Sequence, residues 1–403
     1  MIKLKKLSNG LKIFYLGQLG SPKRIYLTLF IKCGSLFEKK LEFGFSHLIE
    51  HLLINRRYDN FNNLSDFLKF IDVDYEAFVG KEYSSFLFDL PVKVLDKFNN
   101  FLQEFFSFNP SSNKLKIEKR VVVEETELML EKNQKEIFYS IRDREIFGNH
   151  PLSNNFYGKK KSIQQATIKK IIDFFYRHYQ PENIVFGLIG DWKAVDKFLN
   201  NLQKINFVNA GLKKIIKFPT VRSISKKRII EVRNKNFNQS HFIYTFLYRD
   251  LLKKDYILMP LIQLLIEKEL FRKLREEFGL VYHIESNFYT YASCLISILD
   301  FYTSCQVTKT KEVLKLIPAI IKNFNFNEKN FYQTKKILID SITADPFDLL
   351  EYYSGWLLYN RSVFDPEQTQ RLIEKIKFQE FRRYFQEKII KHRESLILVG
   401  KPS

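Results

Sequence analysis

Cysteine is scarce in this sequence, with three residues (Cys33, Cys294 and Cys305) in 403 and no C-x-x-C pair. An odd number of cysteines without close spacing argues against a disulfide framework and a thiolate metal site, and it favours a reducing compartment. Glycine and proline are also few, at 14 and 11, whereas phenylalanine reaches 40. Together with the many lysines and asparagines, these counts are typical of a protein from an AT-rich genome.

Long apolar runs are missing as well. No stretch approaches the roughly 18 apolar residues that indicate a membrane-spanning helix. The first ten residues, MIKLKKLSNG, contain neither the continuous apolar segment nor the small-residue cleavage site of a secretory signal. We therefore expect a cytoplasmic protein with no membrane partner.

Acidic residues are fewer than basic ones, 45 against 65, and the formal net charge is +20. Such a charge can indicate nucleic acid, an anionic membrane or acidic substrates as partners. Here the basic residues are spread along the whole chain, often beside acidic ones, as in residues 267–269, and no nucleic-acid recognition motif accompanies them. We therefore interpret the charge as codon bias plus a solvated surface, and we expect no nucleic-acid partner.

The length of 403 residues exceeds that of one compact core and predicts two domains of about 200 residues each. In the first half, apolar periodicity and turn residues predict strands at 11–16, 25–33 and 184–189, a strand pair within 75–90, and helices at 44–55, 64–71, 92–106, 114–147 and 167–179.

The second half repeats this order roughly 210 residues later. A strand at 241–246, a helix at 260–278, strands within 282–301 and a strand at 396–399 follow one another as their counterparts do. We therefore expect an α+β fold of two homologous domains, each an antiparallel-rich sheet covered by helices. The expected domains are residues 1–208 and 228–403, joined by a basic linker at 209–227 that lacks periodicity.

Residues 44–53 read GFSHLIEHLL and contain an H-x-x-E-H motif, the reverse of the commoner H-E-x-x-H. On a helix, His47 and His51 at positions i and i+4 project from one face and can chelate a single zinc ion. Glu50 lies beside them, where it can take a proton from the water that a catalytic zinc activates, rather than bind the metal.

An alternative interpretation is that both histidines lie on a solvated helix face beside a carboxylate. The surrounding sequence argues against it, because the neighbouring positions are apolar: Phe43, Phe45, Leu48, Ile49, Leu52 and Leu53. Two histidines and a glutamate on such a helix would be costly to bury without a metal or strong hydrogen bonds. The segment therefore favours a zinc site.

A catalytic zinc typically takes three protein ligands and leaves one position for water. The helical segment 118–127, EKRVVVEETE, offers carboxylates for the third ligand. Glu118 and Glu125 are two helical turns apart and share a face, whereas Glu124 and Glu127 point elsewhere. The helical pattern alone does not choose between Glu118 and Glu125.

These motifs resemble the insulinase/pitrilysin family of inverted zincins, and especially its single-unit members, which are similar to mitochondrial-processing-peptidase subunits and their bacterial relatives. The similarity runs nearly end to end, through NGL at 9–11, KCGS at 32–35, GFSHLIEH at 44–51, EKRVVVEE at 118–125, FGNHPL at 147–152 and YQPEN at 179–183. The resemblance implies that Glu125 is the third zinc ligand and that Glu118 supports a ligand from outside the coordination sphere. His150 resembles a residue of a family turn rather than a ligand.

Two further segments resemble family motifs. REEFGLVY at 275–282 is similar to a second-domain motif, which implies that Tyr282 donates to the oxyanion of the tetrahedral intermediate and that Arg275 holds the substrate backbone or assists the tyrosine. EAFVGKEY at 76–83 is similar to the edge strand that binds peptide by strand addition, which implies substrate contacts from Glu76, Ala77, Phe78 and Glu82. The sequence departs from the family here, since Glu76 replaces the usual Asn and Val79 the usual Thr.

The motifs predict a zinc-dependent endopeptidase that hydrolyses extended, unstructured peptides, with zinc bound in residues 1–208 and the Arg/Tyr pair supplied by residues 228–403. The alternative is a non-catalytic scaffold or partner subunit of a family heterodimer. Such members usually lose part of the H-x-x-E-H or Arg/Tyr motif, and this chain keeps both. Besides a peptide or unfolded polypeptide substrate, the expected partner is a second copy in a homodimer, with a paralogue in a heterodimer as the alternative.

Overall fold

The computed structural model describes residues 3–17, 23–207, 221, 228–342, 345–361 and 365–403. The chain forms two compact units. Unit 1 comprises Met1–Leu130, Asn149–Pro219 and Asp345–Val363, and unit 2 comprises Glu131–Gly148, Thr220–Ala344 and Phe364–Ser403. Each unit therefore includes one short segment whose sequence lies within the other half of the chain.

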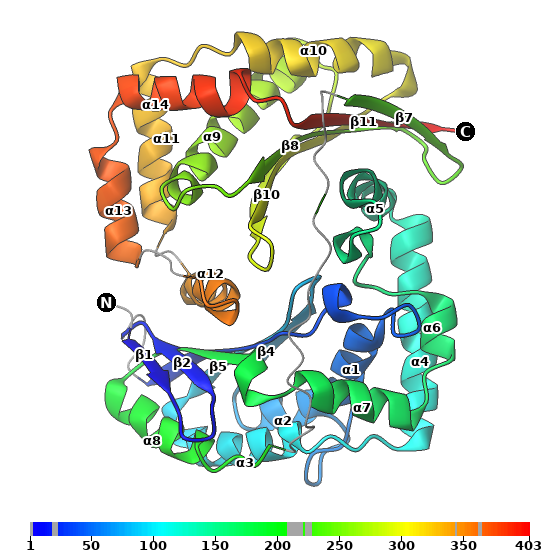
Figure 1. Ribbon diagram of the computed structural model, residues 1–403, viewed down its shortest axis with the longest axis vertical. Helices are drawn as coiled ribbons and strands as arrows, with labels where there is room; N and C mark the ends of the chain where they lie inside the picture. Colours follow the sequence, from blue (N-terminus) through cyan, green and yellow to red (C-terminus); the bar gives the residue numbers. More distant parts are fainter. Residues whose placement is uncertain (1–2, 18–22, 208–220, 222–227, 343–344, 362–364) are drawn as a thin grey trace. The chain divides into compact units, whose positions relative to one another are not determined.

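The sheet of unit 1 has six strands among the described residues, in the order β1-β2-β6-β3-β5-β4 (Figure 1). These strands are β1 (Lys3–Lys6), β2 (Lys12–Tyr15), β3 (Arg24–Ile31), β4 (Asp74–Val79), β5 (Ser84–Pro91) and β6 (Ile184–Ile189). Only β2 and β6 pair in parallel, and the other neighbours are antiparallel. This mixture confirms the antiparallel-rich sheet that the sequence predicts.

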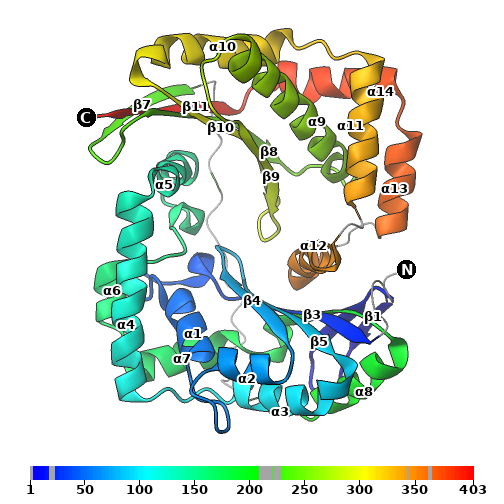
Figure 2. The same cartoon turned by 180° about the vertical axis from the view of Figure 1, so that it is seen from behind.

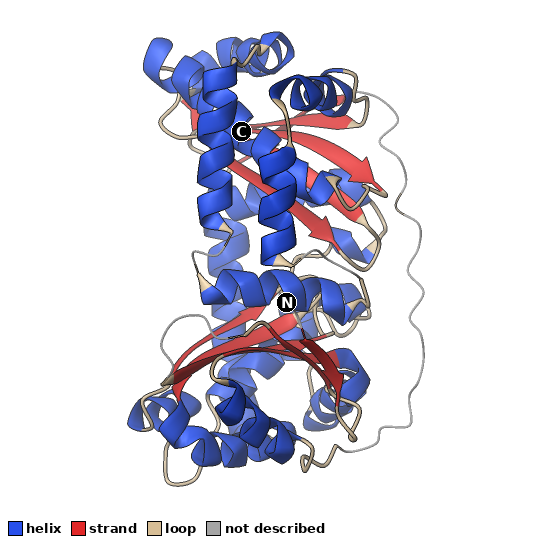
Figure 3. Cartoon of the chain, turned by 90° about the vertical axis from the view of Figure 1, so that its left-hand side faces the viewer, coloured by secondary structure: helices blue, strands red, loops and turns tan. Residues whose placement is uncertain are grey.

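The central strand β3 is buried on both faces of this sheet, and its side chains are mainly apolar on both sides. Ile25, Leu27 and Leu29 face the main core, which is covered by α1 (Phe45–Ile54), α2 (Leu64–Phe70), α3 (Leu95–Phe106), α7 (Ile168–His178) and α8 (Trp192–Leu202). Phe30, one residue out of that phase, faces the opposite side. There it packs against α12 (Pro346–Leu358), a helix from the second half of the sequence (Figure 3).

Unit 2 repeats the topology. Its described strands follow the order β7-β11-β8-β10-β9 and are β7 (Arg228–Asn234), β8 (Ser240–Arg249), β9 (Glu285–Tyr291), β10 (Ile296–Cys305) and β11 (Ser395–Pro402). The pair β7–β11 is parallel and the following pairs are antiparallel. The strands β2-β6-β3-β5-β4 of unit 1 pair in the same pattern, with β2–β6 as the parallel pair. The predicted duplication of an α+β unit is therefore confirmed.

The helices of unit 2 also cover both faces of its sheet (Figure 2). One face carries α9 (Asp255–Leu270), α10 (Thr310–Asn323), α11 (Glu328–Ser341), α13 (Pro366–Lys375) and α14 (Phe378–Phe385). The other face packs against α5 (Gln134–Phe147), a helix from the first half of the sequence, whose Phe138 lies with Ile243 and Tyr302 in one apolar cluster. Within the described ranges, no helix combines the length and apolar character needed to cross a bilayer.

The prediction of one long helix over 114–147 is wrong. Helix α4 (Ser112–Glu127) passes into a π-helical segment, Leu128–Lys132, and the helix then ends at Asn133. Asn133 has an extended backbone, and its side chain accepts a hydrogen bond from the backbone N–H of Glu136, so that it starts α5 as an N-cap. The break separates α4, which belongs to unit 1, from α5, which belongs to unit 2.

The two units differ from the expected consecutive domains by the exchange of α5 and α12. The expected ranges 1–208 and 228–403 hold the two sheets, but residues 131–148 belong to unit 2 and residues 345–363 to unit 1. The expected linker at 209–227 lies outside the described residues, except for Val221.

Candidate metal centre

Helix α1 carries the H-x-x-E-H motif and follows its N-cap residue Gly44, whose φ of 96° lies in the left-handed region that favours glycine. Its apolar side faces the core of unit 1 through a row of buried residues: Phe45, Leu48, Ile49, Leu52 and Leu53. His47 is 7% exposed, and Glu50 and His51 are partly buried. The expected helix is confirmed, and its two histidines lie on the side that faces α4.

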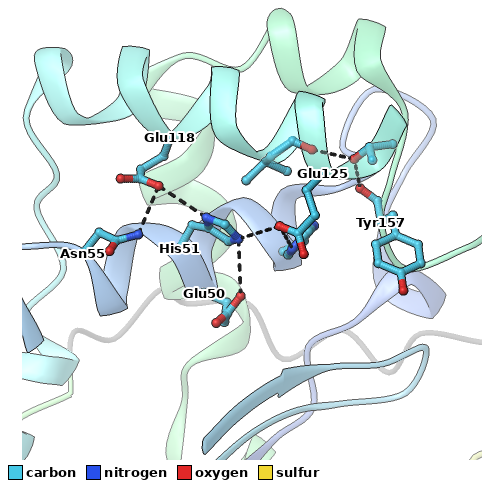
Figure 4. Close-up of polar contacts among 9 residues, drawn as sticks. Glu50, His51, Asn55, Glu118, Glu125 and Tyr157 are labelled. Atoms are coloured by element: carbon cyan, nitrogen blue, oxygen red, sulfur yellow. Dashed lines mark hydrogen bonds and ion pairs between the residues drawn. The ribbon is translucent and has the colours of Figure 1, made fainter. Parts of the chain in front are cut away.

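Helix α4 packs against α1 and directs two carboxylates toward it, as Figure 4 shows for Glu118 and Glu125. The Glu125 Oε2 atom lies 3.5 Å from His47 Nε2 and 3.2 Å from His51 Nε2. The Glu118 Oε2 atom lies 3.3 Å from the other ring nitrogen of His51, Nδ1. The two glutamates therefore contact the histidine pair in different ways.

These distances fit a zinc ion. In a tetrahedral site with bonds of about 2.0–2.1 Å, neighbouring ligand atoms lie about 3.4 Å apart, close to the 3.5 and 3.2 Å that separate Glu125 from the two Nε2 atoms. The Nδ1 atom of His47 is buried and has no hydrogen-bond partner among the described residues, so Nε2 is the ring nitrogen that meets the other groups. Glu118 accepts from Nδ1 of His51, which turns the Nε2 lone pair toward the same point.

Glu50 completes the cluster from the side of α1. Ligand atoms of His47, Glu50 and His51 all lie within 4.8 Å of one another. The contact between Glu50 Oε2 and His51 Nε2 measures 3.9 Å, longer than the two contacts of Glu125. That separation suits a group that reaches a water molecule beside the metal, whereas Glu125 has the spacing of a ligand.

The pKa values of Glu125 and Glu50 are shifted in opposite directions. Hydrogen bonds from His47 and His51 lower the pKa of Glu125. Burial raises the pKa of Glu50, although both histidines oppose that shift. Glu125 is thus held as an anion suited to a cation, while the ionised form of Glu50 is destabilised and has a greater tendency to take a proton.

Glu118 has two further partners besides His51. Asn55 Nδ2, at the C-cap of α1, donates to Glu118 Oε2 at 3.1 Å, and Lys114 Nζ lies 3.1 Å from Oε1. Burial would raise the pKa of Glu118, but the hydrogen bonds with His51 and Lys114 outweigh it and lower the pKa. The i, i+4 spacing of Lys114 and Glu118 was a visible signal, whereas the contact with Asn55 depends on helix packing.

Tyr157 also borders the cluster without a signal in the sequence. Its ring centre lies 6.1 Å from that of His47, and its carbonyl accepts from Thr126 Oγ1 at 3.0 Å (Figure 4). Thr126 is the neighbour of Glu125 on α4, so this bond ties the loop that holds Tyr157 to the helix that holds the carboxylate. The nearby His150 accepts from the backbone N–H of Leu152 and caps a short turn.

The expected substrate strand is β4, which lies at the end of the sheet order. Glu76, Ala77 and Phe78 lie within β4, and the Phe78 side chain is 46% exposed. Glu82 follows in the turn to β5 and is buried. Among the described strands, β4 pairs with β5 alone, so its other edge is not paired with a described strand.

Arg275 and Tyr282 lie together in unit 2. Arg275 belongs to the π-helical segment Phe271–Glu277, and its guanidinium carbon lies 5.4 Å from the centre of the Tyr282 ring, within the range of a cation–π contact. Tyr282 is 62% exposed. This pair belongs to unit 2 and the His/Glu cluster to unit 1.

The sequence was compared with known protein families. The profile of "Insulinase (Peptidase family M16)" matches residues 21–160, and that of "Peptidase M16 inactive domain" matches residues 165–338. The chain belongs to peptidase family M16. The family expected from the motifs is therefore confirmed, and the two matches follow the order of the duplicated units.

Some relatives within the family are named as zinc proteases, and another is named as a non-peptidase homolog. The chain is 21% identical to an "Uncharacterized zinc protease" of Rickettsia felis over 93% of this chain and 92% of that protein. It is 27% identical to "Probable zinc protease PqqL" of Haemophilus influenzae, but the match covers 50% of this chain and only 23% of that longer protein. It is also 28% identical to "Non-peptidase homolog YmxG" of Helicobacter pylori, over 49% of this chain and 46% of that one.

Solved structures show the same fold. A protease from Helicobacter pylori superposes with a TM-score of 0.84 at 18% identity, over the full length of both chains. A "peptidase M16 inactive domain" from Pseudomonas fluorescens gives a TM-score of 0.84 at 17% identity, over 100% of this chain and 98% of that one. At 17–18% identity these superpositions show a shared fold only. Any catalytic role has to be argued from the residues of this chain.

Proposed function

We propose that this protein is a zinc-dependent endopeptidase in which His47, His51 and Glu125 bind the metal and Glu50 is the catalytic base. The observation that carries the proposal is the convergence of two imidazole Nε2 atoms on one oxygen of Glu125, at 3.5 and 3.2 Å. The names of the Rickettsia felis and Haemophilus influenzae relatives, both called zinc proteases, support the same metal.

When bound, zinc supplies the Lewis acidity that activates a water molecule and polarises the scissile carbonyl. Glu50 takes the proton of that water on its carboxylate and passes it to the leaving amine. Its partly buried position beside the histidine pair, with Oε2 3.9 Å from His51 Nε2, supports this role. Glu118 holds the Nδ1 proton of His51, which keeps the ring in one orientation.

Substrate binding is proposed at the free edge of β4. An extended peptide would add to this edge through backbone hydrogen bonds, and Glu76, Ala77 and Phe78 of β4 would contact it, whereas Glu82 would act only from its buried position in the turn to β5. This mode requires an unstructured substrate, because a folded chain has few free strand-like segments. We further propose that Tyr282 donates to the oxyanion of the tetrahedral intermediate and that Arg275, which contacts its ring, supports it.

The test separates chemistry from metal binding. Glu50→Gln is expected to retain zinc and to lose about 10²–10⁴-fold in turnover, the usual contribution of a general base. Glu124→Gln, an exposed change on α4, is the matched control and is expected to leave both quantities unchanged. Cleavage of an unstructured peptide library and elemental analysis give the two readouts. Wild-type turnover by the Glu50 variant would remove Glu50 from the mechanism.

A non-catalytic partner role is the second candidate, favoured by the name "Non-peptidase homolog YmxG" of the Helicobacter pylori relative. The chain retains His47, Glu50, His51 and Glu125 with converging geometry, which such a role does not require. Zinc-loaded wild-type protein that cleaves no peptide of the library would favour the partner role over the peptidase.

A further inference from the structure

Glu38 is a buried carboxylate that the proposed mechanism does not use. Its residue is 6% exposed, and it lies in the short segment that leads into α1. Its Oε2 atom accepts from the backbone N–H of Gly44 at 2.8 Å, and its Oε1 atom accepts from that of Ser46 at 2.8 Å. Both oxygens of one side chain thus hold the first amide groups of the helix that carries the His/Glu cluster.

Helix α1 has no cap of its own. The first amide groups of a helix lack partners within it, and a Ser, Thr, Asp or Asn at the N-cap normally supplies one. Here the N-cap is Gly44, which has no side chain. A Cβ atom at this position would lie 2.9 Å from Ile163 Cγ1 and 3.1 Å from the Cα of Gly158, so a capping side chain does not fit. The acceptor has to come from elsewhere, and Glu38 provides it.

The position of Glu38 is unfavourable for a carboxylate. Burial raises the pKa of Glu38 to about 7, although the N–H groups of Gly44 and Ser46 lower it, and the nearby Glu42 raises it further. Arg177 of α7 does not contact Glu38 in the structure but pairs with Glu42 at 2.8 Å. The dry environment makes the two bonds to α1 stronger and less mobile than the bonds of an exposed cap.

Helix α8 shows the ordinary arrangement in the same unit. Its own N-cap residue, Asp191, accepts from the N–H groups of Lys193 and Ala194 at 3.0 and 3.2 Å. Asp191 is partly exposed and serves a helix outside the His/Glu cluster. Both carboxylates hold two amide groups at a helix start, but only Glu38 is buried and precedes a proposed metal ligand.

We propose that Glu38 is a positioning residue for the metal centre, which fixes the first turn of α1 so that His47 stays aligned with His51 and Glu125. The amide that Glu38 holds at Ser46 is the one immediately before His47, so a rotation of the first turn would move the imidazole directly. This inference rests on the proposed zinc site, but it does not depend on peptide cleavage.

The test uses cobalt as a spectroscopic replacement for zinc and Glu38→Gln as the variant. Glutamine keeps the shape but offers one acceptor and one donor, so its NH₂ group would face an amide N–H. We expect Glu38→Gln to release metal to a chelator about 10-fold faster or more, a loss typical of supporting residues. We also expect its visible cobalt absorption to be shifted or weakened.

Asp191→Asn is the matched control, because it makes the same chemical change at the cap of α8. It is expected to release metal at the wild-type rate and to keep the cobalt spectrum. Glu38→Asp retains two acceptor oxygens, so its cobalt spectrum is expected to lie between those of Glu38→Gln and the wild type. If Glu38→Gln does not fold, Glu38→Asp is the variant that is measured.

The outcomes separate this inference from the function. A wild-type spectrum and release rate in both Glu38 variants would overturn the positioning role. Metal binding with the expected response in Glu38→Gln, but no peptide cleavage by the wild type, would support the positioning role and overturn the peptidase. Failure of the wild type to bind cobalt or zinc would overturn the metal centre and the positioning role together.

Discussion

The two units share one topology but differ in the helix that follows their central strand. In unit 1 this helix is α1, whose two histidines contact Glu125 of α4 and whose Glu50 lies beside them. In unit 2 it is α9, which contains no histidine, holds Pro260 and buries a mainly aliphatic set: Ile257, Leu258, Met259, Leu261, Ile262, Leu265, Ile266 and Leu270. The duplicated fold therefore provides equivalent positions, and the side chains on one helix decide which copy carries the proposed metal ligands.

A second difference concerns the helix that each sheet receives from the other half of the sequence. Helix α12 meets its sheet mainly through apolar residues such as Leu350 and Tyr353, with one buried hydrogen bond between Ser354 and Thr28 at 3.0 Å. Helix α5 adds a buried ion pair, in which Arg142 contacts Asp300 of β10. The same packing role is thus performed by different chemistry, with different consequences for stability.

The largest expected effect distinguishes α1 from α9. The protein should bind one zinc per chain, all of it in unit 1. Glu125→Gln should weaken zinc binding by more than the about 10–100-fold that follows loss of a supporting residue, because it removes a ligand. Glu127→Gln, on the same helix but paired with Lys160, is the control and should retain the metal. Elemental analysis after dialysis measures both, and equal zinc content would refute the ligand assignment.

The next effect concerns the ion pair under α5. Arg142 is 3% exposed, and Asp300, which is fully buried, also accepts from Thr245 Oγ1 at 2.5 Å. Asp300→Ala leaves the buried Arg142 charge with Asp143, 2.7 Å away, as its remaining carboxylate, and should lower the free energy of unfolding by about 3 kcal/mol, the low end of the range for a broken buried ion pair. Denaturant unfolding followed by circular dichroism measures the loss. A change below about 1 kcal/mol would mean that water or Asp143 compensates the arginine.

The corresponding change under α12 should be milder. Ser354→Ala removes one neutral hydrogen bond to Thr28 and should lower the free energy of unfolding by about 1 kcal/mol. The same unfolding experiment compares it with Asp300→Ala. A loss from Ser354→Ala as large as that from Asp300→Ala would show that the two exchanged helices are held alike, contrary to the difference in their contacts.

The smallest effect is a pH dependence. Burial lowers the pKa of His178 in unit 1 to about 3, from 6.5, so the folded protein keeps this ring neutral. The free energy of unfolding is therefore highest, as far as His178 is concerned, above pH 6.5. It falls as the pH drops from about 6.5 toward 3, because in this range the unfolded chain binds a proton at His178 and the folded protein does not.

Between pH 6.5 and 5.5 this loss should reach about 1 kcal/mol. His178→Asn, which keeps a donor for the carbonyl of Lys32, should flatten the dependence in this range, whereas His241, whose pKa is lowered to about 4, keeps a similar dependence in unit 2. Thermal unfolding at several pH values measures the effect. An unchanged slope in His178→Asn would contradict it.

The sequence by itself determined the features that depend on spacing along one element. His47, Glu50 and His51 share a helix turn, Glu118 and Glu125 share a helix face, and the strand order repeats in both halves because each follows from local periodicity. Only the tertiary structure decided which atoms meet. It placed Glu125 against both Nε2 atoms and Glu118 against Nδ1.

The tertiary structure also decided features without any local signal. The helical pattern continues through 114–147, yet Asn133 ends one helix and caps the next because the two helices pack in different units. Glu38 caps a helix that begins seven residues later, and α12 covers a sheet whose strands lie far away in the sequence. Such contacts depend on which buried surfaces and unpaired polar groups the fold brings together, and local periodicity carries no information about them.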